Sequence, residues 1–485
     1  MPAAQSCLAG AGIQSRPPCL PRMIPAAMIA VTTALLLSGG LLMWVRITRG
    51  DPAAPLAAAA VWGLCLAVSL SVLRLHPLSP AMVYLYVFGV FHLGLVVPWS
   101  MELDVGPVPA WMLRNGLEPA LSLVIVALMA YLAGASLAAW KWPSRKAATS
   151  VHVRYHNEAM FHCGLAIFLG GLVMFLWGLR SLGFERLLSA TYFETYRLAN
   201  WYDPRFFVTS LNVAPIGLYL MAAATRWRWI AAVLLTVLVW SSVIFWLGFR
   251  GFGLIPVITV LAVVHKRRFR LPKLAYPAGI AVMLFAIPLI TVLRDARLEE
   301  RSIPEAARAL RPLAAVSEMG ASLRPLVHTL HYMETEDFRW GQTYWRGLLA
   351  VFPNVASNWE GSAYLPLEEL PPSHWVTKQA APWSYTHFGG LGFSAVAEPY
   401  MNFGTAGVVL YFIALPAFLV WADRVDAVLP TRLATWAVLL GPLLWTTRNS
   451  FDNFFRPALL GLLCVFFARL AANSLASIRG GRAAP

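Results

Sequence analysis

LEPALSLVIVALMAYLAGASLAAW, residues 117–140, gives the clearest indication of the fold. It has one acidic residue, Glu118, near its start and no basic residue. About 20 apolar residues in a helix cross the hydrocarbon core of a bilayer, which is roughly 30 Å thick. Within lipid, every backbone N–H and C=O group must be bonded internally, which favours a helix. The stretch therefore predicts a transmembrane helix.

Similar apolar blocks recur along the chain, which is 59% hydrophobic and only 13% charged. A soluble protein carries roughly twice that charged fraction. A membrane β-barrel would instead show alternating segments of about ten residues, and the sequence has none. The predicted fold class is an all-α polytopic membrane protein with about twelve transmembrane helices, at 24–45, 53–73, 78–99, 117–140, 159–182, 206–224, 229–248, 252–265, 274–293, 403–422, 433–447 and 455–472.

The blocks divide the chain into four parts. Residues 1–22 form an N-terminal tail without the apolar core of a signal peptide. Met23 is an alternative start, which would leave this tail untranslated. Residues 23–293 hold the first nine helices, and 294–402 form one large loop that contains short helices. Residues 403–485 hold the last three helices and a tail.

Lysine and arginine predict the orientation, because short cytoplasmic loops carry an excess of both. They gather in alternate gaps, at 141–154, 226–228, 266–273, 424–432 and after 469, and only Arg46 and Arg49 lie on the wrong side. Both termini are therefore expected in the cytoplasm. The segments 183–205 and 294–402 are expected on the outer face.

The net charge of +15 does not indicate a nucleic-acid partner, since the basic residues lie between apolar blocks and form no zinc-finger or basic–aromatic pattern. None of the five cysteines lies in the large loop. That loop therefore has no disulfide framework.

Arginines stand at expected outer ends of helices. Arg250 lies between Gly248 and Gly251, and Arg294 and Arg297 follow the ninth helix. Such a side chain can simply extend to lipid headgroups. Alternatively, guanidinium groups bind phosphate oxygens in pairs and keep their charge, so several at one interface would suit a lipid-attached pyrophosphate.

Two groups of residues have partial metal-site spacing. His328, His331 and Glu334 recur every three residues, but no further ligand has matching spacing, and no metal is predicted. Glu102 and Asp104 form an acidic pair in an outer loop. Such a pair is common by chance.

The most distinctive segment is GGLGFSAVAEPYMNFG, residues 389–404. Its glycines permit tight turns and close backbone approach. Glu398 and Asn402 share a face if this stretch is helical. A carboxylate where the chain re-enters the bilayer is a candidate base or hydrogen-bond anchor. It can also be a plain helix-entry cap.

This segment resembles the signature of the bacterial oligosaccharide repeat-unit polymerases, the Wzy-type O-antigen polymerases. Their Gly-Gly-x-Gly-x-Ser element precedes Ala-Glu-x-Tyr-x-Asn-Phe-Gly and a late transmembrane helix. Gly248-Phe249-Arg250-Gly251 is similar to the family's Gly-x-Arg-Gly, and Gly341-Gln342-Thr343-Tyr344 followed by Phe352-Pro353 fits more weakly. The resemblance covers roughly residues 160–420, and the first 150 residues match only in being hydrophobic.

The resemblance implies polymerisation of glycan repeat units carried on undecaprenyl pyrophosphate, at the periplasmic face of the bacterial inner membrane. The growing chain is transferred to the non-reducing end of a new unit. No nucleotide sugar, cofactor or metal takes part. The lipid-linked glycans and membrane lipids are the partners, and a chain-length regulator and a flippase act in the same pathway.

Roles follow for particular residues. The pyrophosphate is assigned to Arg250, Arg294, Arg297 and Arg205. The base is assigned to Glu398, with His328, His331 and His387 as rivals. Sugar rings are expected to stack on four outer aromatic residues, Trp359, Trp375, Trp383 and Tyr385. Anchoring of these side chains at the membrane interface is an equally good interpretation.

Two other functions remain open. An O-antigen ligase-like enzyme shares the architecture and the donor but uses lipid A–core as its acceptor. A secondary transporter also fits a count of twelve helices, although transporters usually have related halves and the late large loop breaks such symmetry.

Overall fold

The computed structural model of the chain describes residues 20–47, 53–103, 108, 110–114, 116–142, 153–183, 204–267, 313–351, 369–386, 390–424 and 430–481. Within these residues 84% are helical and there is no strand. The predicted all-α class is therefore confirmed.

Eight described helices are long and apolar enough to cross a membrane. They are α1 (Leu20–Ile47), α2 (Ala54–Ser71), α6 (Leu117–Lys141), α7 (Val153–Leu182), α10 (Pro204–Ala224), α11 (Trp227–Trp246), α20 (Ala397–Arg424) and α22 (Asp452–Gly481).

Shorter helices occupy three further predicted blocks. They are α3 (Pro80–Leu93) with α4 (Val96–Ser100), α12 (Arg250–Arg267) and α21 (Pro430–Trp445). The predicted block 274–293 lies outside the described residues. The count of twelve therefore stays a prediction.

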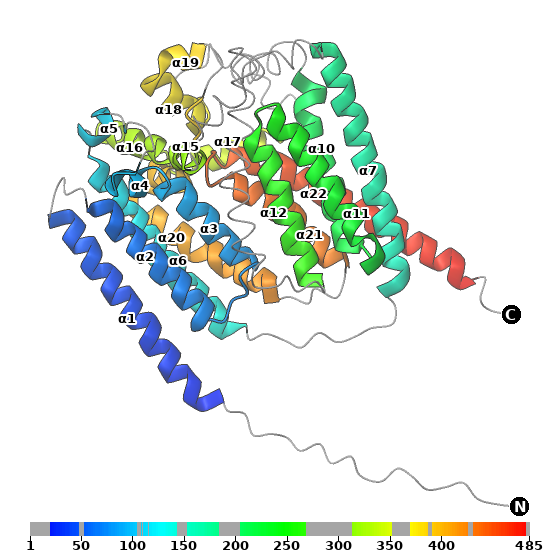
Figure 1. Cartoon of the computed structure of the whole chain (residues 1–485), viewed down its shortest axis with the longest axis horizontal. Coiled ribbons are helices and arrows are strands. Elements are labelled where there is room, and N and C mark those ends of the chain that lie inside the picture. The colour runs from blue at the N-terminus through cyan, green and yellow to red at the C-terminus, as the bar shows by residue number, and fades with distance from the viewer. Residues whose placement is uncertain are drawn as a thin grey trace, which may run out of the picture.

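The long helices pack side by side as two groups (Figure 1). One contains α1, α2, α3, α6 and α20, and the other contains α7, α10, α11, α12, α21 and α22. Small residues allow this close packing, as is usual in membranes. A Cβ on Gly134 of α6, for example, would lie 2.2 Å from the carbonyl oxygen of Ile413 in α20.

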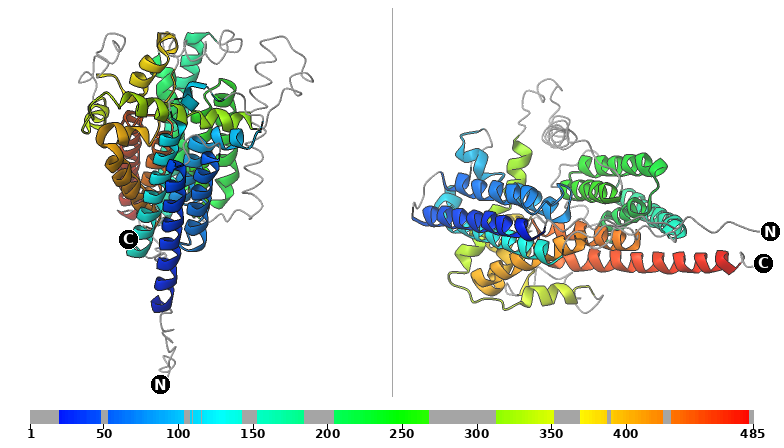
Figure 2. Two further views of the ribbon diagram at one scale, coloured as in Figure 1. Left: turned by 90° about the vertical axis from the view of Figure 1, so that its left-hand side faces the viewer. Right: turned by 90° about the horizontal axis from the view of Figure 1, so that it is seen from below.

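Short helices gather at one end of the bundle, as Figures 1 and 2 show. They are α5 (Ala110–Arg114), α15 (Ala314–Gly320), α16 (Leu323–Tyr332), α17 (Gln342–Leu349), α18 (Pro372–Ala380) and α19 (Pro382–Thr386). All but α5 belong to the predicted loop 294–402. The short helices expected within that loop are therefore present in its described part.

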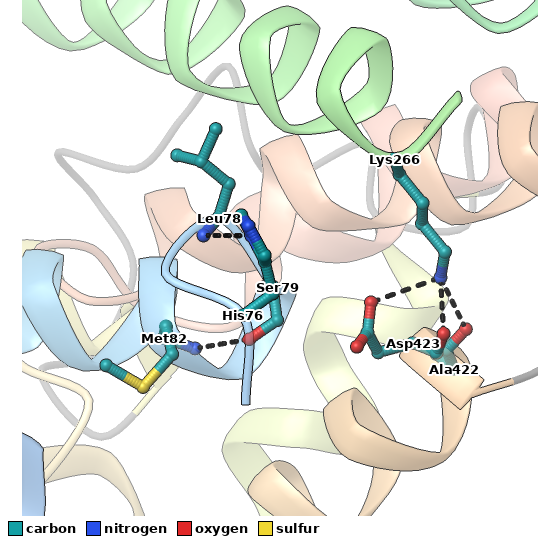
Figure 3. A network of polar contacts seen from close by, with 7 residues as sticks. All are labelled: His76, Leu78, Ser79, Met82, Lys266, Ala422 and Asp423. Atoms are coloured by element: carbon teal, nitrogen blue, oxygen red, sulfur yellow. Dashed lines mark hydrogen bonds and ion pairs between the residues drawn. The ribbon is translucent and has the colours of Figure 1, made fainter. Parts of the chain in front are cut away.

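Basic side chains join helix ends away from these short helices. Lys266 at the end of α12 donates from Nζ to the carbonyl oxygen of Asp423 at 2.6 Å and to its Oδ1 at 3.2 Å, as Figure 3 shows. Arg424 donates to the carbonyl oxygens of Ala139 and Trp142 at the end of α6. The last turns of α6, α12 and α20 therefore meet at one end of the bundle.

Candidate functional site

The helix α20 is interrupted near its start. Phe403 has φ −142° and ψ 16°, and Gly404 has φ 63° and ψ −154°. The backbone conformation of Gly404 is one that essentially only glycine adopts. The break separates a short helical piece, 397–402, from the long apolar part that follows, and it falls at the predicted start of the tenth membrane block.

Glu398 lies in the short piece and is 3% exposed. Its Oε1 accepts a hydrogen bond from Thr343 Oγ1 at 2.8 Å, and its Oε2 accepts one from the backbone N–H of Phe451 at 2.6 Å. Hydrogen bonds to a carboxylate are stronger than those between neutral groups. The side chain therefore ties α20 to α17 and to the residue that precedes α22.

Asn402 lies one turn later and is fully buried. Its Nδ2 donates to Thr343 Oγ1 at 2.7 Å and to the carbonyl oxygen of Glu398 at 2.9 Å. Its Oδ1 accepts from the N–H of Gly341 at 2.9 Å. The prediction that Glu398 and Asn402 share a helix face is confirmed.

The glycine-rich part of the motif packs against the turn before α22. Gly392 has φ 72°, and a Cβ there would lie 2.8 Å from the carbonyl oxygen of Arg448. The N–H of Phe393 donates to the same oxygen at 2.6 Å. A side chain at Gly392 would therefore be strained and would also push this turn away.

Ser394 lies three residues before α20 and ties its start to α3. Its Oγ accepts from the N–H of Val396 at 3.1 Å, in the manner of a helix cap. The same Oγ is hydrogen-bonded at 2.8 Å to Nε2 of the buried His92. The motif thus contacts α3, α17 and the start of α22, which are far apart in sequence.

A pocket opens beside this network. Its charged lining residues are Arg346, Glu369 and Asp452, and the others are Gln342, Thr343, Gly347, Leu370, Pro371 and Pro372. Arg346 and Glu369 form an ion pair at 4.0 Å with both side chains partly exposed. Thr343 belongs both to the pocket and to the Glu398 network, so the two are directly connected.

Asp452 is the first residue of α22. Its Oδ2 accepts from Nδ2 of Asn453 at 3.1 Å. Its Oδ1 is buried and has no hydrogen-bond partner among the described residues. A buried polar atom without a partner is costly, and this one belongs to a residue that lines the pocket.

Two of the four predicted pyrophosphate arginines, Arg250 and Arg205, lie among the described residues. Arg250 at the start of α12 forms an ion pair with Glu318 of α15. Arg205 lies in the first turn of α10. Arg294 and Arg297 lie outside the described residues.

The predicted histidines lie in different surroundings. His328 stacks on Trp111 with ring centroids 3.9 Å apart, and on Tyr332 at 5.9 Å. Burial, and to a lesser degree the nearby charges of His331 and Arg324, lowers the pKa of His328 to about 4. His331 is exposed. His387 lies outside the described residues.

The predicted sugar-binding aromatics also differ from one another. Trp375 is 1% exposed, with Arg339 5.8 Å above its ring and Tyr332 at its edge, whereas Trp383 is 65% exposed. Tyr385 is half-buried beside Lys378. Trp359 lies outside the described residues.

Sequence reasoning missed several residues around the pocket: Trp340, Trp345, Arg346, Arg448 and Asp452. Trp340 and Trp345 are 75% and 59% exposed. The sequence did contain a signal for Asp452. This residue lies shortly before the last apolar block, just as Glu398 lies shortly before the tenth apolar block. Among the described residues, no three His, Cys, Asp or Glu side chains form a group that could hold a metal ion. Glu102 is exposed, and Asp104 lies outside the described part.

The long apolar helices define the class, which is a helical membrane protein, and a pocket with three charged lining residues lies beside its glycine-rich motif. The family model for "O-antigen polysaccharide polymerase Wzy" matches residues 28–475, and the chain belongs to this family. It is therefore a polysaccharide polymerase of the glycosyltransferase type that acts on lipid-linked oligosaccharide repeat units. The ligase-like and transporter alternatives are not favoured. No curated protein and no solved structure matches the chain.

Proposed function

We propose that the chain elongates a glycan on undecaprenyl pyrophosphate at the outer face of the inner membrane, in the pocket between α17, residues 369–372 and the start of α22. The observation that carries the proposal is the contact between two segments that resemble the family, 341–344 and 389–404. Asn402 and Glu398 of the second segment bind Gly341 and Thr343 of the first. Thr343 in turn lines the pocket.

The distribution of charge supports the orientation. Lys141, Lys266 and Arg424 end α6, α12 and α20, and the contacts of Lys266 and Arg424 join these ends. The pocket is lined mainly by α17 and by residues 369–372 at the start of α18, and both helices lie at the end with the short helices (Figure 1). With the basic end in the cytoplasm, the loop 294–402 is periplasmic, about twelve helices cross the membrane and both termini are cytoplasmic.

The reaction is one displacement at the anomeric carbon of the donor sugar. The acceptor hydroxyl oxygen bonds to that carbon, and the carbon–oxygen bond to the pyrophosphate breaks. The electron pair leaves on the pyrophosphate, and the hydroxyl proton passes to a base. The reaction requires positive charge at the leaving group and a proton acceptor at the hydroxyl.

The positive charge has candidates on two helices. Arg346 lines the pocket itself, and its ion pair with Glu369 is long and partly exposed, so it is a weak one. Arg250 pairs with Glu318, whose side chain is 51% exposed. Either guanidinium can exchange its carboxylate for phosphate oxygens, which it binds with the same fork geometry. Arg294, Arg297 and Arg205 remain proposed members of this group.

Exposed aromatics supply the surface for the sugars. Trp340 lies directly before Gly341, and its N–H donates to the carbonyl oxygen of Asn402 at 3.1 Å. Its ring is therefore held next to the network while remaining open to solvent. Trp345 and Trp383 are also open. Flat, exposed indole rings bind the apolar faces of sugars and leave their hydroxyls free.

The test is the glycan ladder of a deletion strain that carries plasmid-borne variants. A collapse to a single repeat in the deletion strain supports the polymerase. Loss of all capped lipid A–core would indicate a ligase, and an unchanged pattern would indicate transport.

Thr343→Val tests the location of the site, because it keeps the shape but removes the hydroxyl shared by Glu398 and Asn402. We expect short chains at normal membrane abundance. Thr335→Val is the matched control, since Thr335 is exposed and bonds only a carbonyl of its own turn. Full-length polymer from Thr343→Val would contradict the location.

A further inference from the structure

Two carboxylates lie next to the pocket, and they differ in what their oxygens are bound to. Both oxygens of Glu398 accept hydrogen bonds, one from Thr343 and one from the N–H of Phe451. Asp452, the next residue, has one oxygen without a partner among the described residues. A base needs a lone pair that points at its substrate. Oδ1 of Asp452 has no donor among the described residues, whereas each oxygen of Glu398 already accepts one hydrogen bond.

The backbone around Asp452 is held from two sides. Glu398 binds the N–H of the preceding residue, Phe451. From α17, Gly347 approaches so closely that a Cβ on it would lie 2.9 Å from Cα of Asp452. The aspartate is therefore fixed against the helix that also carries Arg346. One pocket thus combines a carboxylate for a hydroxyl and a guanidinium for an anion.

We infer that Asp452 is the base that accepts the proton of the acceptor sugar hydroxyl, and that Glu398 is a positioning residue that holds Asp452 in place. This inference rests on the proposed function. The hydroxyl proton goes to Oδ1 of Asp452 as the sugar oxygen bonds to the anomeric carbon. The departing pyrophosphate takes the electron pair and faces Arg346. Asp452 then releases the proton to water.

A purely structural role for Asp452 makes a different prediction. A carboxylate in the first turn of a helix stabilises it by roughly 0.3–1 kcal/mol through the helix dipole. Asparagine is also favoured near a helix start. If Asp452 acts only in this way, Asp452→Asn should leave the rate of elongation nearly unchanged in folded protein.

The experiment uses the purified full-length chain in proteoliposomes with an undecaprenyl-pyrophosphate-linked repeat unit as the probe. Loss of a general base lowers kcat by about 10²–10⁴-fold. We expect Asp452→Asn to lower kcat by at least about 100-fold and to change KM by less than about threefold. Asp337→Asn is the matched control, because Asp337 is exposed among the short helices, and it should match the wild type.

Further variants keep the test decisive if Asp452→Asn is unstable. Asp452→Glu retains the carboxyl, and its kcat should be at least about tenfold above that of Asp452→Asn. Glu398→Gln should lower kcat less than Asp452→Asn and should shift the acidic limb of the pH profile of kcat, whereas Asp452→Asn should abolish that limb.

The possible results distinguish a failure of the proposed function from a failure of the role assigned to Asp452. A wild-type protein that fails to elongate the probe overturns the proposed function. A wild type that elongates, with equal kcat for Asp452→Asn and Asp452→Glu, overturns the inference alone. A higher KM at unchanged kcat in Asp452→Asn also overturns it, because the aspartate would then only bind the sugar.

Discussion

Replacing Asn402 by alanine removes the amide that joins α17 to the first turn of α20. Three hydrogen bonds disappear, at 2.7, 2.9 and 2.9 Å, and Asn402 is fully buried. Each contributes about 0.5–1.5 kcal/mol net. Two of these bonds, to Thr343 and from Gly341, join α17 to α20, whereas the third lies within α20, so the attachment of α17 loses about 2 kcal/mol. This cost falls on the attachment of α17 rather than on the long apolar helices.

Hydrogen–deuterium exchange measures that attachment directly. A loss of about 2 kcal/mol in local opening free energy raises the opening equilibrium roughly 30-fold. We expect peptides covering α17 to exchange roughly 30-fold faster in purified Asn402→Ala, while peptides from α6 keep the wild-type rate. Glycan chains should shorten in the same strain, because Thr343 and Arg346 lie on the helix that detaches.

Asn212→Ala is the control. Asn212 makes one hydrogen bond, at 3.2 Å, to a carbonyl oxygen of its own helix, α10. Its loss should leave the exchange of α17 unchanged. If α17 in Asn402→Ala exchanges within about threefold of the wild type, the amide does not hold this helix, and the reasoning from its contacts fails.

Three further predictions concern charge, topology and pH. Arg250→Lys and Arg294→Lys keep the charge but lose the planar fork for phosphate, so both should shorten the glycan ladder at matched abundance; near-normal polymer would mean that they only anchor helices. Reporter fusions at 200 and 360 should be active only with a periplasmic reporter, and cytoplasmic activity would refute the orientation. Burial lowers the pKa of His328 to about 4, below about 6.5 in an unfolded chain, so protonation favours unfolding. The stability present above about pH 6.5 should be lost as the pH falls through about 4, and thermal unfolding in detergent should show a smaller loss in His328→Gln.

The membrane helices could be predicted because their length and apolar composition leave few alternatives. The block expected at 117–140 is α6, and the block expected to begin at 403 begins at the break beside Gly404. Backbone hydrogen bonding in lipid dictates a helix wherever such a stretch occurs. Two other blocks were less certain, because α12 and α21 are not among the eight described helices that are long and apolar enough to cross a membrane.

The contacts of the site could not be predicted in the same way. Thr343 and Glu398 are separated by 55 residues, and a hydrogen bond between a loop helix and a membrane helix leaves no periodic pattern. Local spacing could also mislead. His328 and His331 share a helix face as expected, but Trp111 stacks on the ring of His328 from a distant short helix. Such a stacking partner is visible only in three dimensions.

The break in α20 explains why this motif contains both a glycine and buried polar residues. A continuous helix would use the carbonyl oxygens of Met401 and Asn402 within itself. Because the helix stops at Gly404, these two oxygens accept hydrogen bonds from the N–H groups of Arg339 and Trp340 instead. The side chain of Asn402 then meets Gly341, and Glu398 meets Thr343.

Each of these buried polar groups would be costly without its partner. The break in α20 therefore has a second consequence besides ending the short helical piece. It presents free carbonyl oxygens at the end of a membrane helix, where the segment before α17 can bind them. The glycine conformation at position 404 therefore makes possible the attachment of α17, which lines the pocket.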